Sequence, residues 1–135
     1  MIREVKFKDI SETVKLVNFW ARKSRLLAVT KKEIKERIGL SWIWEERKRI
    51  VGYVSLLIYR KDLAEVRSLC VQEKYQKKGI GTKLLKKTLQ EAKKRNITTV
   101  LVITKVPQFY NLIGFQQKLE GKEALLIDPR RLKYK

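Results

Sequence analysis

Residues 76–82 have the composition of a phosphate-binding loop. The segment reads Gln76, Lys77, Lys78, Gly79, Ile80, Gly81 and Thr82, and it lies between an apolar segment and a stretch with helical periodicity. The two glycines let the backbone turn several N–H groups toward one anion, and the positive end of the following helix adds to the attraction. We therefore predict a site for a diphosphate. A surface loop that precedes a solvated lysine face is the alternative reading.

The spacing of this loop differs from two common nucleotide-binding motifs. The Walker A pattern Gly-x-x-x-x-Gly-Lys-Ser/Thr is absent. A dinucleotide fingerprint would need a third glycine and an acidic residue on the next strand. The loop therefore predicts a diphosphate without identifying the molecule that carries it.

The composition narrows the chemistry further. The 135 residues include one cysteine and no histidine, which excludes Ser-His and Cys-His catalysis, His-ligated zinc and an intrachain disulfide. We accordingly predict no metal site. The 33 basic and 14 acidic residues give a net charge of +19, which attracts polyanions. Nucleic acid, an acidic membrane face, a phosphorylated cofactor and an acidic substrate all qualify, and a solvated surface with no single target is the alternative.

Length and hydropathy predict one globular domain over residues 1–135. The apolar fraction of 44% is ordinary for such a domain. The longest apolar runs are far shorter than the ~20 residues of a membrane span, and the charged N-terminus is unlike a signal peptide. We therefore expect a soluble, cytoplasmic protein without a membrane partner.

Hydrophobic periodicity predicts the elements that position the loop. Apolar residues alternate or recur at helical spacing along most of the chain, and Thr30 with Glu33 forms a capping box. The predicted strands are residues 2–7, 41–46, 50–59, 63–71, 98–104 and 123–127, and the predicted helices are residues 11–23, 30–38, 80–95 and 107–113. We predict an α/β (α+β) fold, in which a mixed and mostly antiparallel sheet has helices on both faces.

Alternation along residues 63–71 assigns side chains to two faces of a strand. Glu65 and Arg67 fall on one face with Leu69 and Val71, and Cys70 falls on the opposite face. Cys70 has no histidine to activate it, so we expect it to be a small buried hydrophobic residue.

Two segments taken together resemble the GNAT acetyltransferases. Residues 76–81 look like the Arg/Gln-x-x-Gly-x-Gly/Ala pyrophosphate loop of this family. Residues 109–115, Phe-Tyr-Asn-Leu-Ile-Gly-Phe, resemble its Phe-Tyr-x-x-x-Gly-Phe motif. The separation of the motifs and the order of the elements match as well, so the resemblance covers residues 2–127.

A closer similarity is to the acetyltransferase domain of N-acetylglutamate synthases. Residues 16–21, 26–27, 63–69, 104–109 and 113–115 carry it. Members often have an arginine two residues after the Leu-Leu pair, where this chain has Val29. The amino-acid-kinase domain that accompanies many of these synthases is absent from this sequence. The resemblance implies an enzyme that moves acetyl from acetyl-CoA to the amine of a small acceptor, with L-glutamate as the candidate acceptor.

The resemblance also implies how coenzyme A is bound. In the family, the strand before the loop presents backbone groups to the pantetheine arm, as an added strand would. Those positions correspond to Leu69, Cys70 and Val71. The loop of residues 76–82 would hold the diphosphate, mostly through backbone N–H groups.

The same resemblance implies catalytic roles for three residues in acetyl transfer. Because a free α-amino group is largely protonated at neutral pH, the amine needs a base, and Glu65 is the candidate, directly or through water. The N–H of Val71 is the candidate oxyanion donor. Tyr110 matches the tyrosine that protonates the leaving thiolate in many members, with packing as the alternative because phenylalanine often stands there in close synthases. Arg67 is the candidate for an acceptor carboxylate, with a salt bridge to Glu65 as the alternative.

Other functions stay open on this evidence. The same fold could acetylate a protein N-terminus or a lysine, although residues 102–109 lack the Asn-x-x-Ala stretch of such relatives. A subunit that binds coenzyme A without turnover is a further reading. A nucleic-acid-binding module without catalysis is the non-enzyme alternative, and its basis is the basic C-terminal residues Arg130, Arg131, Lys133 and Lys135. This alternative is not favoured, because it leaves the glycine loop at 79–81 unexplained. A homodimer or a separate partner chain is equally open.

Overall fold

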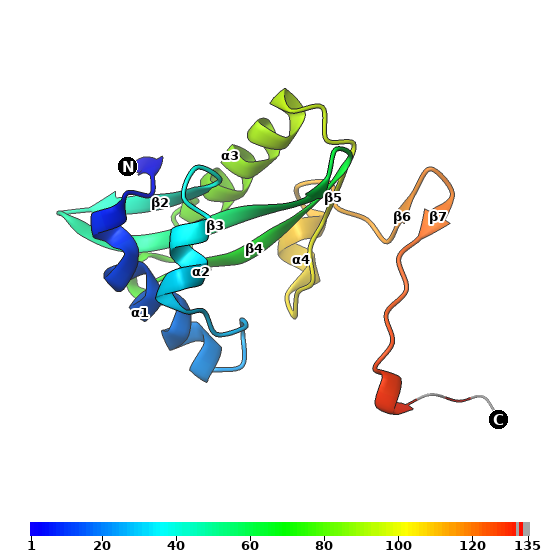
Figure 1. Cartoon of the computed structure of the whole chain (residues 1–135), viewed down its shortest axis with the longest axis horizontal. Coiled ribbons are helices and arrows are strands. Elements are labelled where there is room, and N and C mark those ends of the chain that lie inside the picture. The colour runs from blue at the N-terminus through cyan, green and yellow to red at the C-terminus, as the bar shows by residue number, and fades with distance from the viewer. Residues whose placement is uncertain (132, 134–135) are drawn as a thin grey trace. The chain divides into compact units, whose positions relative to one another are not determined.

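The structure of the protein is a computed structural model, and it describes residues 1–131 and 133. Lys135, part of the predicted basic tail, lies outside the described residues. The chain divides into two compact units, Met1–Lys105 and Val106–Lys135 (Figure 1). The first unit contains the sheet and the predicted phosphate-binding loop.

The first unit is built on a five-stranded sheet with the order β1-β2-β3-β4-β5. The strands are β1 (Ile2–Glu4), β2 (Ser41–Glu46), β3 (Arg49–Arg60), β4 (Leu63–Val71) and β5 (Thr99–Leu101). The first four are antiparallel to their neighbours, and β5 runs parallel to β4. The predicted mixed, mostly antiparallel sheet is confirmed.

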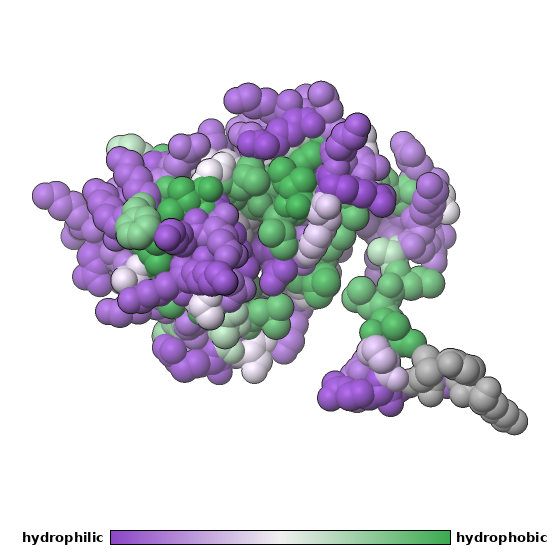
Figure 2. All heavy atoms as spheres, viewed as in Figure 1, coloured by the Kyte–Doolittle hydropathy of each residue, from purple (hydrophilic) through white to green (hydrophobic). Residues whose placement is uncertain are grey.

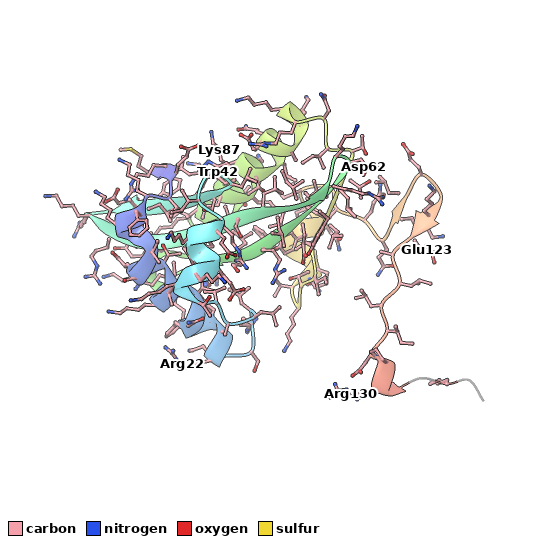
Figure 3. All side chains as sticks on the ribbon, viewed as in Figure 1. Arg22, Trp42, Asp62, Lys87, Glu123 and Arg130 are labelled. Atoms are coloured by element: carbon pink, nitrogen blue, oxygen red, sulfur yellow. The ribbon has the colours of Figure 1, made fainter. Side chains whose placement is uncertain are left out.

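Helices cover both faces of this sheet, as predicted (Figure 1). The helices α1 (Ile10–Arg22) and α2 (Lys31–Glu36) bury apolar side chains against Ile43 and Tyr53 on one face. On the other face, α3 (Ile80–Lys94) packs Ile80 and Leu84 so closely that a Cβ on Gly52 would lie 2.9 Å from Leu84 Cδ1. Trp42 of β2, which is 2% exposed, belongs to this second layer (Figure 3).

Local hydrogen bonds explain where several elements begin and end. The predicted capping box is present, because Glu33 N–H donates to Thr30 Oγ1 and Thr30 N–H donates to Glu33 Oε1. The first strand ends at Glu4 rather than at residue 7. The backbone N–H of Lys6 donates to the Asp9 carboxylate, and this contact turns Phe7–Asp9 into a 3-10 helix.

A bulge in β4 changes which side chains share a face. Arg67 lies opposite Ser55 and Cys70 lies opposite Tyr53, so β4 holds one more residue than β3 over this interval. The extra residue is Ser68, whose φ is 58°. Glu65, Arg67 and Cys70 therefore all point to the face covered by α1 and α2. The prediction that Cys70 faces away from Glu65 is wrong, because strict alternation cannot anticipate an inserted residue.

The second unit is small and contains short elements. Pro107 opens the helix α4 (Pro107–Asn111), and the chain turns at Gly114, whose φ is 124°. The strands β6 (Lys118–Leu119) and β7 (Lys122–Glu123) form a hairpin. The predicted strand at 123–127 is wrong for residues 124–127, which pair with no strand among the described residues. A turn at Glu120 and Gly121, both with positive φ, directs the pairing to residues 118–123 instead.

Candidate functional site

The loop before α3 leaves a helix N-terminus open. After the 3-10 turn Glu73–Tyr75, the chain passes through Lys77 and Gly79, whose φ angles of 63° and 82° are left-handed, and α3 begins at Ile80. No side chain caps this helix, and its first turn contains no acidic residue. Its first N–H groups lack partners within the helix. An open, positively polarised terminus of this kind is suited to a diphosphate, which supports the predicted role of residues 76–82.

Gln76 connects this loop to the end of β4. Its side-chain Nε2 donates to the backbone oxygen of Val71 at 2.9 Å. This bond crosses from the loop to the preceding strand, so it fixes the peptide plane of Val71 relative to the helix terminus. The sequence assigned Gln76 to the loop but gave no indication of this contact.

The Val71 N–H points away from β3. The Gln72 N–H donates to Val51 at 2.7 Å, which makes Gln72 and Val51 a hydrogen-bonded antiparallel pair. The next pair along the strand, Val71 and Gly52, is therefore of the non-hydrogen-bonded type, with its polar backbone groups directed outward. On that side β5 pairs only with residues 63–65 of β4. Among the described residues, no strand covers the outer edge of β4 at Val71.

These two features fit the parts of a coenzyme A molecule. The uncapped α3 terminus suits the diphosphate, and the unpaired edge of β4 suits an extended arm that carries amide groups. Val71 lies on this unpaired edge, next to the loop. Cys70 pairs with Tyr53 of β3, so its backbone groups face β3 rather than the open edge. The assignment of the other predicted residues to coenzyme A stays a prediction.

Basic side chains surround the loop and extend along α3. The ammonium groups of Lys74 and Lys78 lie 5.9 and 5.6 Å from the ring centroid of Tyr75, and Lys83 lies 5.5 Å from Trp44. In Figure 2, hydrophilic residues gather along the margins of the first unit with an apolar area between them, and Figure 3 shows Lys87 on α3. The positive charge predicted from composition therefore includes a concentration at the loop, where it favours phosphate binding.

Glu65 lies on the α1/α2 face of β4 and is 6% exposed. Tyr59 Oη donates a hydrogen bond to its Oε1. Arg67 Nη1 approaches the same oxygen at 3.7 Å. A buried carboxylate held by two neighbours is positioned to accept a proton from a nearby group, and its second oxygen receives none of these contacts. The salt bridge between Arg67 and Glu65, one of the two readings of Arg67, is present. Its role toward an acceptor carboxylate stays a prediction.

Tyr59 was missed by the sequence reasoning. The hydrogen bond to Glu65 raises the pKa of its hydroxyl, with burial as the second cause, so Tyr59 remains a neutral donor near pH 7. The hairpin register pairs Leu57 with Glu65, which puts Tyr59 on the same face near the turn. The short turn between β3 and β4 already indicates that Tyr59 and Glu65 lie near each other. Placing both side chains on one face also requires the pairing register of the two strands, which alternation alone does not give.

Cys70 is buried, as the sequence predicted. It is 8% exposed, and burial raises the pKa of its thiol well above the usual range. The thiolate is therefore not available near neutral pH, which agrees with a packing role for the side chain.

Tyr110 belongs to the second unit. Its ring packs edge-on against Phe109 and Phe115, with centroid separations of 5.0 and 5.5 Å. These three aromatic residues are the ones that carried the second family motif. The ring geometry explains why the motif needs aromatic residues at these spacings, while the role of the Tyr110 hydroxyl stays a prediction.

Comparison with known proteins identifies the family. Residues 7–119 match the model of the acetyltransferase (GNAT) family. An uncharacterized N-acetyltransferase of Chlorobaculum tepidum is 25% identical over 116 residues, which cover 86% of this chain and 75% of the relative.

Two solved structures share the fold. Rv2747 from Mycobacterium tuberculosis, in complex with CoA and NLQ, superposes with a TM-score of 0.81 at 25% identity and covers 88% of this chain and 73% of its own. The N-acetylglutamate synthase from Neisseria gonorrhoeae, complexed with coenzyme A and N-acetyl-glutamate, gives 0.82 at 22% identity. That match covers 97% of this chain and 31% of the synthase.

The chain therefore belongs to the GNAT acetyltransferase family. It is an acyltransferase that uses acetyl-CoA, and the open α3 terminus with the unpaired edge of β4 is the part of the first unit suited to that co-substrate. Among the described residues, no cluster of acidic or cysteine side chains has the arrangement of a metal site, and no helix is long and apolar enough to cross a membrane.

Proposed function

We propose that this protein transfers the acetyl group of acetyl-CoA directly to the amine of a small acceptor, with L-glutamate as the first candidate. One observation carries the proposal. The outward N–H of Val71, beside the open α3 terminus, lies on the same strand as the buried carboxylate of Glu65. The two groups are six residues apart on β4, about 20 Å along the strand, so a proton from an amine at the thioester would reach Glu65 through a chain of water molecules.

Glu65 is proposed as the base that takes the proton from the acceptor ammonium through a chain of water molecules. Tyr59 and Arg67 hold its Oε1, which leaves Oε2 for the proton. Once deprotonated, the amine attacks the thioester carbonyl, so that the C–N bond forms as negative charge develops on the carbonyl oxygen. The Val71 N–H is proposed to stabilise that oxygen.

Collapse of the tetrahedral intermediate breaks the C–S bond and releases the thiolate of coenzyme A. We propose that the Tyr110 hydroxyl gives this thiolate its proton. A phenol is a stronger acid than water and a neutral donor at pH 7. The support is the family motif at residues 109–115 and the packing of Phe109 and Phe115 around the Tyr110 ring.

L-Glutamate is proposed as acceptor on three grounds. The chain is similar to the synthase domain quoted above, Arg67 offers a guanidinium next to Glu65, and the net charge of +19 favours an anionic substrate. Val29 stands where many synthases have an arginine, so carboxylate binding here would depend on other residues.

The test is the release of coenzyme A thiol from acetyl-CoA, with and without L-glutamate, at moderate salt. Glutamate-dependent release, with N-acetylglutamate identified by mass spectrometry, supports the reaction and the acceptor together. Release only with other amino acids, polyamines or peptides would retain the reaction and replace the acceptor. Absence of both acetyl-CoA binding and thiol release would contradict the proposal.

The role of Tyr110 has its own test. Tyr110→Phe should lower kcat about tenfold to a hundredfold and leave the Kd of acetyl-CoA within about twofold, because the ring and its packing remain. Phe109→Leu is the matched control, since it disturbs the same aromatic cluster without removing a hydroxyl. An unchanged kcat in Tyr110→Phe would rule out the acid role.

A further inference from the structure

Ser68 is a strained residue at the bulge of β4. Its φ of 58° is left-handed, a conformation that glycine adopts without steric cost and other residues adopt rarely. In bulges whose inserted residue has a positive φ, that residue is ordinarily glycine. A serine here keeps a side chain where the backbone favours none. Such strain persists only where the surrounding structure holds the residue in place.

Arg37 holds this serine from the helix layer. It is the residue that follows α2, and its side chain is 8% exposed. Its Nη1 donates to Ser68 Oγ at 3.2 Å. Its Nη2 lies 3.6 Å from a carboxylate oxygen of Glu33. The guanidinium therefore has one partner on α2 and one on the bulge, so it connects the helix to the inserted residue of β4.

Two buried serines fix the backbone on either side of this contact. Ser41 Oγ donates to the backbone oxygen of Arg37 at 3.0 Å. Ser55 Oγ donates to the backbone oxygen of Arg67 at 3.1 Å, just before the inserted residue. The first bond holds the backbone that carries the guanidinium, and the second holds the start of the bulge. The bulge is thus held from α2 and from β3.

The bulge determines the direction of the Val71 N–H. With Ser68 inserted, Val71 lies opposite Gly52, in a pair whose backbone groups point away from β3. If Ser68 were paired like its neighbours, every later residue would move one position along β3, and Val71 would lie opposite Val51. Val51 accepts a backbone hydrogen bond from β4, here from Gln72. The Val71 N–H would then donate within the sheet instead of outward.

We infer that Arg37 is a positioning residue for acetyl transfer. By holding Ser68, it keeps the bulge in place and so keeps the Val71 N–H directed toward the open edge of β4. Without this contact, the strained serine relaxes by a shift of register. The inference rests on the proposed function, in which the Val71 N–H stabilises the oxyanion. Arg37 acts through Ser68 and not on the reacting atoms.

The first experiment measures acetyl-CoA binding and turnover in variants of this contact. Arg37→Met removes the donor and keeps a long apolar stem, so it should raise the Kd of acetyl-CoA and lower kcat, each about tenfold. Ser68→Gly keeps the bulge backbone and removes the acceptor, so its effect should be smaller and in the same direction. The double variant should be no worse than Arg37→Met alone, because both changes remove one contact. Fully additive effects, or an unchanged Kd and kcat in Arg37→Met, would overturn the inference.

Glu33→Gln is the matched control. It removes the charge beside Arg37 Nη2 and keeps a side-chain oxygen for the capping box of α2. It should leave the Kd of acetyl-CoA and kcat within about twofold, because a half-exposed ion pair contributes little. Ser68→Asn should retain function, since asparagine tolerates a positive φ and offers an acceptor oxygen. Equal losses in Glu33→Gln and Arg37→Met would assign the effect to the packing of α2 and refute the positioning role.

A second measurement does not depend on turnover. Amide hydrogen exchange is followed by NMR in the ligand-free protein. In the wild type, the Gln72 N–H should exchange slowly, because it is bonded in the sheet at 2.7 Å, and the outward Val71 N–H should exchange quickly. Arg37→Met should speed the exchange at Gln72 about tenfold or more. The Leu56 N–H, which donates to Leu40 at 2.9 Å, should keep its rate. An unchanged rate at Gln72 would overturn the inference.

The two measurements separate this inference from the proposed function. Faster exchange at Gln72 in Arg37→Met, with the Kd of acetyl-CoA and kcat unchanged, would show that the bulge does not position the reaction. The inference would then fail, and the proposed function would stand. If the wild type neither binds acetyl-CoA nor releases its thiol, the proposed function fails and the inference with it.

Discussion

The two halves of β4 differ in what they offer to a ligand. Residues 63–67 are paired on both sides over part of their length and contribute side chains, above all the buried Glu65. Residues 69–71 have a strand on one side only and contribute outward backbone groups, above all the Val71 N–H. Ser68 separates the halves with its left-handed backbone. One strand can thus serve two ligands, because a single inserted residue breaks its alternation.

This comparison leads to different expectations for the two halves. Changes in the side-chain half should affect turnover or the acceptor and leave acetyl-CoA binding intact. Changes at the backbone half and its loop should affect acetyl-CoA binding first. The following variants test that separation, from the largest expected effect to the smallest.

Glu65→Gln should lower kcat about a hundredfold, because it removes the proposed base and keeps the shape of the side chain. The Kd of acetyl-CoA, measured by isothermal titration, should stay within about twofold. Glu91→Gln is the control, since Glu91 is an acid of α3 that pairs with Arg95 away from this face. A weakened affinity for acetyl-CoA in Glu65→Gln would show that the two halves of β4 are not separate.

Gly79→Val should weaken acetyl-CoA binding about tenfold to thirtyfold. Gly79 has a φ of 82°, and a β-branched residue resists this conformation at the start of α3. Gly39→Val is the matched control, because Gly39 also has a positive φ, 101°, with open space around its Cα. Both variants should lose similar stability, and only the first should change the Kd. An equal change in both would point to a general loss of folding.

Gln76→Leu should raise the KM of acetyl-CoA about threefold to tenfold, because the backbone oxygen of Val71 loses its donor. Gln76→Glu should have a larger effect, since its carboxylate would face that oxygen. Gln72→Leu serves as the control, because Gln72 contributes its backbone N–H and not a side-chain contact to the ladder. Equal effects of Leu at both positions would remove the assigned role of Gln76.

Asp9→Asn should leave the kinetic constants unchanged and lower stability at neutral pH by about 2 kcal/mol, because Asp9 is held by two Arg3 nitrogens at 2.7 and 2.9 Å. The hydrogen bonds from Arg3 hold the pKa of Asp9 below its usual range. The stabilisation is therefore complete above about pH 4 and is lost as the pH falls through the lower folded-state pKa. Urea unfolding between pH 2 and 7 measures both effects. A wild type and variant with parallel pH dependence would contradict this assignment.

The difference between local and long-range information explains which predictions were confirmed. The Thr30–Glu33 capping box, the helix start at Pro107 and the glycine turn that leads into α3 all depend on residues within a few positions of one another. Such signals act through the local backbone and are readable in the sequence. The bulge at Ser68 is different, because a serine with a positive φ has no distinctive residue type, and only the register with β3 reveals it.

The sequence by itself determined the family, the order of the main elements and the loop that suits a diphosphate, since these depend on residue types at fixed spacings. The tertiary structure decided that Cys70 shares a face with Glu65 and that Tyr59 donates to that carboxylate. It also decided that Arg37, at the end of α2, donates to Ser68 of β4. Residues from α2, β3 and β4 become neighbours only when the sheet register and the helix packing are fixed, and neither is encoded in any one segment.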